Sequence, residues 1–184
     1  MELNYLKYIS DGLDRDTALV ELMNEYGDDV WNFAFFLVRR SDVADDLCQE
    51  VFLAAYDKLH AYRGESSIKS WLLAITRNKA YKHLKSAFIS KVTLMDYILT
   101  KDTAKSAEAE AFDRLETRHI WNTVMELPVK FREAIVLDAY YQLTVQETAA
   151  MLGVPEGTAK SRLHRARKKL SSLLAVEQEG EGQS

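Results

Sequence analysis

The chain has 184 residues, of which 47% are hydrophobic and 28% charged, a composition typical of a globular protein and not of a disordered one. With only 7 Gly and 2 Pro, it lacks the turn formers that a β-sandwich or barrel needs roughly every 8–12 residues. The net charge of −4, taken alone, argues against nucleic-acid binding, but the charges are unevenly distributed along the chain.

Three further features narrow the class of protein. The longest apolar run near the N-terminus, residues 33–38, is far shorter than the roughly 18 residues that a membrane span requires. The first 16 residues are mixed and acidic and do not read as a signal peptide. The single cysteine, Cys48, excludes an internal disulfide and a Cys-rich zinc site. We therefore expect a cytoplasmic protein without membrane insertion.

The clearest helix in the first half of the chain covers residues 42–59. Its apolar residues share one half of a helical wheel, and its acidic residues lie on the other half. The acidic face indicates a basic protein partner, and a solvated face is an equally good interpretation of the same pattern. Cys48 lies on the apolar half and is expected to pack in the core.

A loop at residues 60–67 precedes a second helix, which we predict to run from Ile68 to about Leu84. No acidic residue occurs from Ser66 to Met95, although the stretch contains several lysines and an arginine. Aromatic side chains and an Asn interleaved with cations suit single-stranded or distorted nucleic acid, because cations hold phosphates and rings stack on bases. A basic amphipathic helix with a core-anchoring Trp is the alternative.

The middle of the chain separates two parts. Residues 90–111 are polar and irregular and read as a linker, and strong helical periodicity returns from residue 112. We predict an all-α fold of two small helical domains. They comprise residues 1–86 and 112–175, with a flexible linker at 87–111 and an acidic disordered tail at 176–184.

The second domain contains a helix-turn-helix pattern. A helix is predicted from Leu127-Pro128 toward Gln142, with Pro in its first turn. Thr144 and Glu147 form a capping box that starts a short helix, and Gly153 supplies the left-handed residue that ends it. A further helix begins around residues 155–158. Its inward stripe, spaced within about 60° at roughly 100° per residue, is Ala159, Leu163, Ala166 and Leu170.

The outward face of this last helix is basic, and no acid occurs between Ala159 and Leu170. In a helix-turn-helix the N-terminal part of the second helix enters the major groove. The side chains expected to reach base edges are Lys160, Ser161, His164 and Arg165. Those better placed for phosphates are Arg162, Arg167, Lys168 and Lys169. The other histidines form no ligand-like group, so we predict no metal, and we predict no cofactor.

Residues 143–170, LTVQETAAMLGVPEGTAKSRLHRARKKL, resemble the helix-turn-helix of bacterial RNA polymerase sigma factors of the extracytoplasmic-function (ECF) group. The family pattern runs from Gly157 to Arg167. A second resemblance lies upstream: residues 45–56 are similar to the family's polymerase-binding helix, and residues 71–84 to its promoter-melting helix. These regions follow one another along the chain in the same order as in the family. The chain departs from the family pattern at Lys82, Thr148 and Ala159.

The resemblance implies a function, partners and roles for individual residues. It implies that core RNA polymerase and promoter DNA are partners, the former through its β′ clamp helices and β flap, and that an anti-sigma factor regulates the chain. The residues that would dock on the clamp helices are Asp45, Asp46, Gln49 and Glu50.

The same resemblance implies two promoter contacts. The loop at residues 62–67 would capture a flipped base of the minus-ten element. The residues that would bind this element are Tyr62, Arg63, Ser66, Ser67, Lys69, Trp71, Arg77, Asn78, Tyr81 and Lys82. Those that would bind the minus-thirty-five element are Lys160, Ser161, Arg162, His164, Arg165, Arg167 and Lys168.

A stand-alone helix-turn-helix regulator of duplex DNA is the main alternative. It accounts for residues 143–170 but not for the acid-free stretch at 66–95 or the acidic helix before it. An enzyme is not expected, because the sequence shows no nucleophile with a base, no Gly-rich phosphate loop and no well-spaced pair of carboxylates. A protein-only adaptor would show no salt-sensitive DNA binding.

Overall fold

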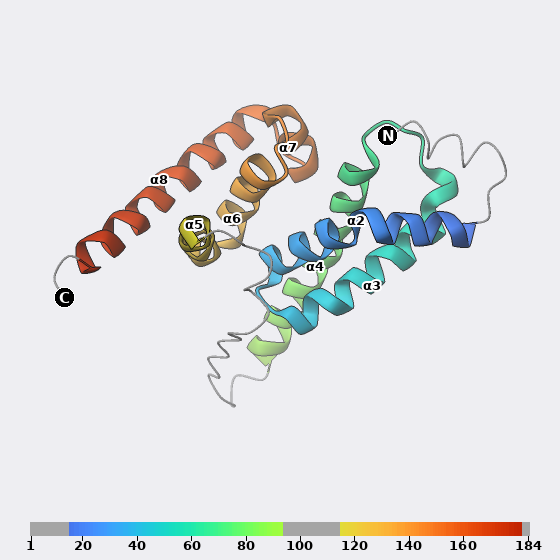
Figure 1. Cartoon of the computed structure of the whole chain (residues 1–184), viewed down its shortest axis with the longest axis horizontal. Coiled ribbons are helices and arrows are strands. Elements are labelled where there is room, and N and C mark those ends of the chain that lie inside the picture. The colour runs from blue at the N-terminus through green and yellow to red at the C-terminus, as the bar shows by residue number, and fades with distance from the viewer. Residues whose placement is uncertain (1–14, 94–114, 182–184) are drawn as a thin grey trace. The chain divides into compact units, whose positions relative to one another are not determined.

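The computed structural model describes residues 15–93 and 115–181, and all regular elements within these ranges are helices (Figure 1). The first compact unit contains α2 (Arg15–Val38), α3 (Ser41–Lys58), the 3₁₀ helix η1 (Leu59–Ala61) and α4 (Ile68–Thr93). The second contains α5 (Leu115–Glu126), α6 (Val129–Ile135), the π-helical turn η2 (Val136–Tyr140), α7 (Val145–Leu152) and α8 (Glu156–Glu181). The predicted all-α fold with two helical units is confirmed.

Helices α2, α3 and α4 pack around one apolar core. Each contributes a fully buried side chain to its centre: Val30 from α2, Val51 from α3 and Leu72 from α4. Cys48 packs against this core and is half-buried, as its place on the wheel predicts. Burial, reinforced by the nearby charges of Asp45 and Asp28, raises the pKa of its thiol, so Cys48 is a packing residue and not an activated nucleophile.

Two helices are longer than predicted. Helix α4 continues past residue 84 to Thr93 and so includes residues 87–93, which we assigned to the linker. Helix α8 continues to Glu181 through residues 176–181, which we assigned to a disordered tail. The reason for α4 is that Gly and Pro are absent throughout its length; α8 continues because Glu and Gln propagate an existing helix well. Residues 1–14, 94–114 and 182–184 lie outside the described residues.

The second unit begins with two helices joined at Leu127-Pro128. Pro128 is the N-cap of α6 and not part of its first turn as predicted. The buried guanidinium of Arg132 donates to the carbonyls of Met125 and Leu127 at 2.7 and 3.0 Å, which satisfies acceptors at the C-terminal end of α5. Helix α6 widens into η2 before it ends, so the predicted helix toward Gln142 is not a regular α-helix.

Helices α7 and α8 pack through small and apolar side chains. Ala159, Leu163 and Ala166 are buried, which confirms most of the predicted inward stripe of α8, while Leu170 is only half-buried. Ala149 and Leu152 of α7 are buried as well. None of the described helices has both the length and the apolar character needed to cross a bilayer.

Thr148 of α7 is 3% exposed, and its hydroxyl has no hydrogen-bond partner among the described residues. A buried hydroxyl without a partner costs roughly 1–3 kcal/mol. Thr148→Val removes the hydroxyl and keeps the shape, so we expect the free energy of unfolding to rise by about 1 kcal/mol in urea denaturation followed by circular dichroism. The exposed Thr158→Val serves as the control, with a change of less than about 0.5 kcal/mol. A Thr148→Val protein less stable than wild type would show that the hydroxyl is satisfied.

Candidate functional site

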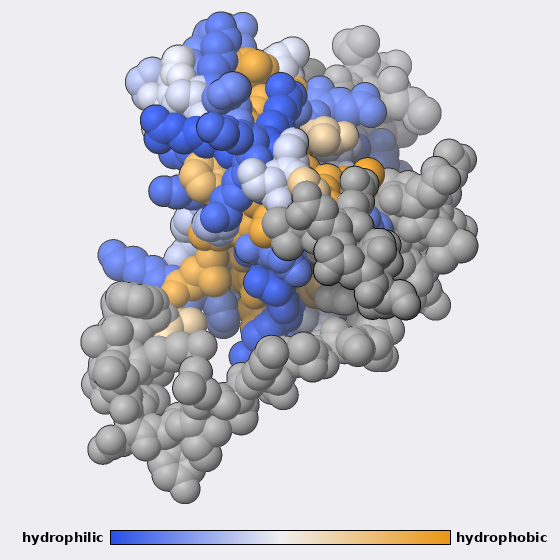
Figure 2. Space-filling view, turned by 90° about the vertical axis from the view of Figure 1, so that its left-hand side faces the viewer, coloured by the Kyte–Doolittle hydropathy of each residue, from blue (hydrophilic) through white to orange (hydrophobic). Residues whose placement is uncertain are grey.

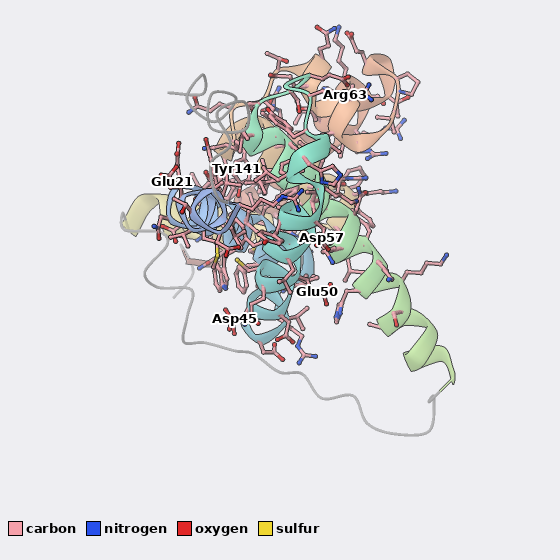
Figure 3. All side chains as sticks on the ribbon, turned by 90° about the vertical axis from the view of Figure 1, so that its right-hand side faces the viewer. Glu21, Asp45, Glu50, Asp57, Arg63 and Tyr141 are labelled. Carbon is pink, nitrogen blue, oxygen red and sulfur yellow. The ribbon has the colours of Figure 1, made fainter. Side chains whose placement is uncertain are left out.

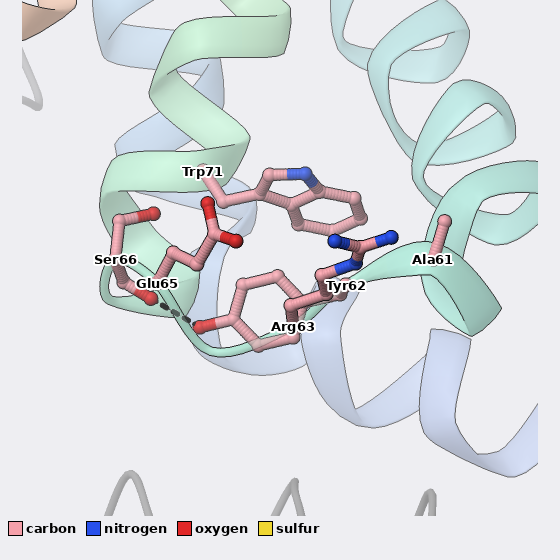
Figure 4. A pocket seen from close by; sticks show the side chains of 6 residues that line it. All are labelled: Ala61, Tyr62, Arg63, Glu65, Ser66 and Trp71. Carbon is pink, nitrogen blue, oxygen red and sulfur yellow. Dashed lines mark hydrogen bonds between the residues drawn. The ribbon is translucent and has the colours of Figure 1, made fainter.

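A cavity of about 340 Å³ opens beside the N-terminal end of α4. Figure 4 shows the residues that line it, which are Ala61, Tyr62, Arg63, Glu65, Ser66 and Trp71. The ring centroids of Tyr62 and Trp71 lie 5.2 Å apart with the planes inclined by 49°. The polar ends of Arg63 and Glu65 lie beside these rings (Figure 4). The cavity therefore offers aromatic surface for stacking and charged groups for the edge of a planar ligand.

Local hydrogen bonds hold the loop that forms this cavity. The hydroxyl of Tyr62 donates to the backbone carbonyl of Ser66, which closes the loop on itself. Ser67 caps α4: its hydroxyl oxygen accepts from the backbone N–H of Ser70 at 3.0 Å, and its carbonyl accepts from the N–H of Trp71 at 2.9 Å. Ser67, a predicted DNA contact, thus fixes the start of α4 and the backbone that carries Trp71.

The cationic surface continues along α4. The Arg77 guanidinium lies 4.7 Å from the ring centroid of Tyr81, so these two predicted DNA contacts form one planar, positively charged unit. Asn78 and Lys82 are exposed on the same helix. Lys69 differs from its neighbours, because its ammonium pairs with Asp29 of α2 at 2.7 Å.

The sequence before α8 determines where that helix begins. The Thr144 hydroxyl accepts from the N–H of Glu147 at 3.2 Å, and the Glu147 carboxylate accepts from the N–H of Thr144 at 2.8 Å, so the predicted capping box is confirmed. Gly153 ends α7 at φ 66°, the predicted left-handed conformation. These two signals delimit α7 and place α8 across it.

Helix α8 presents a polar face along its first turns. The exposed side chains are Lys160, Ser161, His164, Arg165, Arg167 and Lys168, and Arg162 is half-buried. Arg167 also pairs with Asp138 of η2 at 2.7 Å, so this ion pair joins α8 to η2. Figure 2, which faces the side of Figure 1 where α8 is drawn, shows hydrophilic residues over much of the coloured surface. This face has the charge and shape expected for phosphate and base contacts.

The acidic candidates on α3 fall into two groups. Figure 3 shows Asp45 and Glu50 along this helix. The indole N–H of Trp31 donates to Asp45 at 2.6 Å, and Glu50 pairs with Lys79 of α4 at 2.9 Å. Asp46 and Gln49 are exposed, and neither has a hydrogen-bond or ion-pair partner within the described residues.

Comparison with known families assigns both units. The family Sigma-70 region 2 matches residues 22–87, which contain the acidic helix, the cavity and most of α4. The family Sigma-70, region 4 matches residues 118–170, which contain the helix-turn-helix.

Relatives match along most of the chain. RNA polymerase sigma factor SigZ of Bacillus subtilis is 32% identical over 154 residues, which cover 84% of this chain and 85% of that protein. ECF RNA polymerase sigma factor SigM of Mycobacterium tuberculosis is 31% identical over 159 residues, covering 85% and 77%. The chain belongs to the ECF group of RNA polymerase sigma factors. The sigma factor RpoE of Bartonella quintana, solved in complex with the anti-sigma factor NepR, has a similar structure, with a TM-score of 0.71, 26% identity and coverage of 88% of this chain and 96% of that one.

As a sigma factor, the protein binds core RNA polymerase and promoter DNA and directs promoter-specific initiation of transcription. The stand-alone regulator is not supported, because it leaves the region 2 match without an explanation.

Glu65 is not among the predicted DNA contacts, although it lies in the loop that is expected to capture a base. The structure places its side chain at the cavity, beside Tyr62 and Trp71. The pairing of Asp45 with Trp31 was also missed, because the two residues lie 14 positions apart on different helices.

The capping box makes the stability of the sigma factor depend on pH. Hydrogen bonds from the hydroxyl and backbone N–H of Thr144 lower the pKa of Glu147 from its ordinary value of 4.5. A lowered folded-state pKa gives stabilisation that is present above the unfolded-state value and is lost as pH falls through the folded-state value.

We therefore expect wild type to lose more stability than Glu147→Gln when the pH is lowered from about 6 to about 3, since Gln has no charge to lose. Urea denaturation of both proteins at each pH measures the difference. If the free energy of unfolding fell by the same amount in both proteins, the charge of the Glu147 carboxylate would contribute nothing to stability.

Proposed function

We propose that the two units of this sigma factor divide promoter recognition between them. The first unit binds and opens the minus-ten element with the cavity and the cationic face of α4, and the second reads the minus-thirty-five element with α8. The aromatic cavity directly before a cationic, aromatic helix face is the observation that carries this proposal. A surface that only screens duplex phosphates has no need of an open pair of rings.

In this proposal the cavity receives one unpaired base. Extruding a base costs a few kcal/mol, and stacking on an aromatic ring returns about 1–3 kcal/mol. Tyr62 and Trp71 supply the rings, while Arg63 and Glu65 supply a donor and an acceptor for the base edge. Arg77 and Tyr81 continue the surface along α4, where Asn78 and Lys82 are exposed to the same strand.

The reading face of α8 consists of Lys160, Ser161, His164 and Arg165, all of them exposed in its first three turns. Arg162 and Lys168 lie further around and along the helix and suit phosphates. Arg167 lies where it can contact a phosphate, and it also pairs with Asp138. This ion pair holds the orientation of α8.

The remaining parts of the proposal concern protein partners. We propose that the acidic face of α3 docks on the β′ clamp helices of core polymerase and that the second unit contacts the β flap. We further propose that a separate anti-sigma factor inhibits the protein, as the complex of the Bartonella quintana relative with NepR suggests. The protein then acts in the cytoplasm without catalysing a reaction, held at the membrane where its anti-sigma factor is membrane-bound.

Run-off transcription tests whether the protein directs initiation through both promoter elements. Purified protein is mixed with bacterial core RNA polymerase and a template that carries the promoter of its own operon, with core enzyme alone as the control. Initiation that depends on the protein, with footprints over both elements, is the expected result. Tight binding to duplex DNA without polymerase, and no initiation with it, would contradict the proposal.

Trp71→Leu keeps an apolar contact with the core and removes the ring from the cavity. We expect it to destabilise the open complex by about 1–3 kcal/mol, the value of one stacked base. Permanganate reactivity of minus-ten thymines measures the melted fraction. Trp121→Leu is the matched control, since that ring packs against Tyr140 in the other unit. If Trp71→Leu and wild type melted the minus-ten element to the same extent, the proposed role of the cavity would be wrong.

Arg165→Ala and Lys168→Ala separate base reading from phosphate binding. Arg165→Ala is expected to cost about 1–3 kcal/mol on the cognate minus-thirty-five element and to relax discrimination at one base pair. Lys168→Ala is expected to weaken binding evenly across sequences and to lower the salt slope by about 1. Holoenzyme binding to a panel of single-base promoter variants at several salt concentrations distinguishes them. Unchanged base preference in Arg165→Ala would contradict its role.

A further inference from the structure

The side chain of Leu53 on α3 is 64% exposed, more than any other large hydrophobic residue that the structure describes. Its neighbours Val51, Phe52 and Ala55 supply the buried face of the helix, so the core does not use Leu53. Single exposed hydrophobic residues are common, and exposure alone carries no conclusion. The position of Leu53 among the polar residues of α3 indicates that it contacts a partner.

Leu53 lies in the middle of one polar stripe. Asp46, Gln49, Leu53 and Asp57 follow the spacing i, i+3, i+7 and i+11, and all four are exposed. At 100° per residue they fall within about 80° of one another, along roughly 16 Å of helix. This 3-4-4 spacing is the one by which a helix packs along another helix. An apolar centre flanked by polar groups is also the usual anatomy of a protein interface.

The polar groups on this stripe have no partner among the described residues, whereas the neighbouring carboxylates each contact a side chain of another helix. Asp45 accepts from Trp31 and Glu50 pairs with Lys79, so both are already engaged within the unit. Asp46, Gln49 and Asp57 have no such bond among the residues that the structure describes. Figure 3 shows Asp45, Glu50 and Asp57 at successive levels of α3. Of the four predicted polymerase contacts, Asp46 and Gln49 are therefore the free ones.

We infer that Leu53 is the apolar anchor of the polymerase-docking surface and that Asp46, Gln49 and Asp57 form its polar rim, while Asp45 and Glu50 hold α3 in place. This inference rests on the proposed docking of α3 on core polymerase. The partner element is a helix with an apolar side chain opposite Leu53 and basic side chains on its flanks, because two acids of the stripe face it. A second copy of this chain is disfavoured as the occupant, since two acidic stripes repel each other.

The test of the anchor compares two exposed hydrophobic residues of the same unit. Leu53→Ser is expected to weaken binding to core RNA polymerase about tenfold or more, the effect typical of a truncated anchor. Val20→Ser is the matched control, since Val20 is 55% exposed on α2, outside the stripe, and binding is expected to change less than about twofold. Leu53→Met keeps an apolar side chain of similar length and is expected to bind as wild type.

The test of the rim compares two adjacent carboxylates. Asp46→Asn is expected to slow association with core polymerase and to flatten its salt dependence, as the loss of a rim charge does. Asp45→Asn is expected to slow association less than Asp46→Asn, because Asp45 lies outside the stripe and its amide oxygen still accepts from Trp31. Circular dichroism of every variant confirms that the helices are intact. Equal effects of the two substitutions would overturn the assignment of the rim.

A double charge reversal, Asp46→Lys with Asp57→Lys, separates the inference from the function on which it rests. Loss of binding in the double variant together with normal binding of Leu53→Ser would keep the docking of α3 and overturn the anchor. Normal binding of both would show that α3 does not dock on polymerase at all. Loss of binding in both, with Val20→Ser unaffected, supports the surface as defined.

Discussion

Burial of one face of α4 against α2 and α3 determines which side chains of α4 can face a ligand. Leu72, Thr76 and Ala80 are completely buried, so the 3.6-residue period turns Arg77, Asn78 and Tyr81 toward the outside. The same packing brings Lys79 to Glu50 on α3, and the Ser67 cap fixes the first turn that carries Trp71. Helix α4 thus lines the cavity with Trp71, carries the cationic surface and pairs with α3 through Lys79.

In the second unit, local sequence signals determine where the helices begin and end. The capping box and Gly153 delimit α7 within eight residues, and small alanines let α7 and α8 approach closely. Asp138 and Arg167 then connect α8 to η2. The wider turn of η2 places Asp138 at this contact, which is consistent with the frequent occurrence of π-helical turns near functional positions.

Local patterns were enough to predict helices α3, α4, α7 and α8, the capping box, the left-handed Gly153 and the exposed face of α8, because each depends on residues a few positions apart. The end of α4 was missed because no Gly or Pro precedes it, and the end of α8 because its acidic last residues, with Gly180 among them, resemble a disordered tail. Side-chain partners were missed for another reason. Trp31 with Asp45, Lys69 with Asp29 and Glu50 with Lys79 join different helices, and no spacing rule within one helix reveals such pairs.

The bond between Arg167 and Asp138 bears on how promoter specificity can be exchanged between sigma factors. A graft of the whole of α8 from a relative that lacks an Arg at position 167 would remove this ion pair. A shorter graft, limited to residues 160–165, transfers the exposed positions that we propose to read the minus-thirty-five element and leaves the pair between Arg167 and Asp138 intact. If the proposed reading positions are correct, a segment of less than two helical turns is enough to exchange promoter specificity, and the rest of α8 can stay in place.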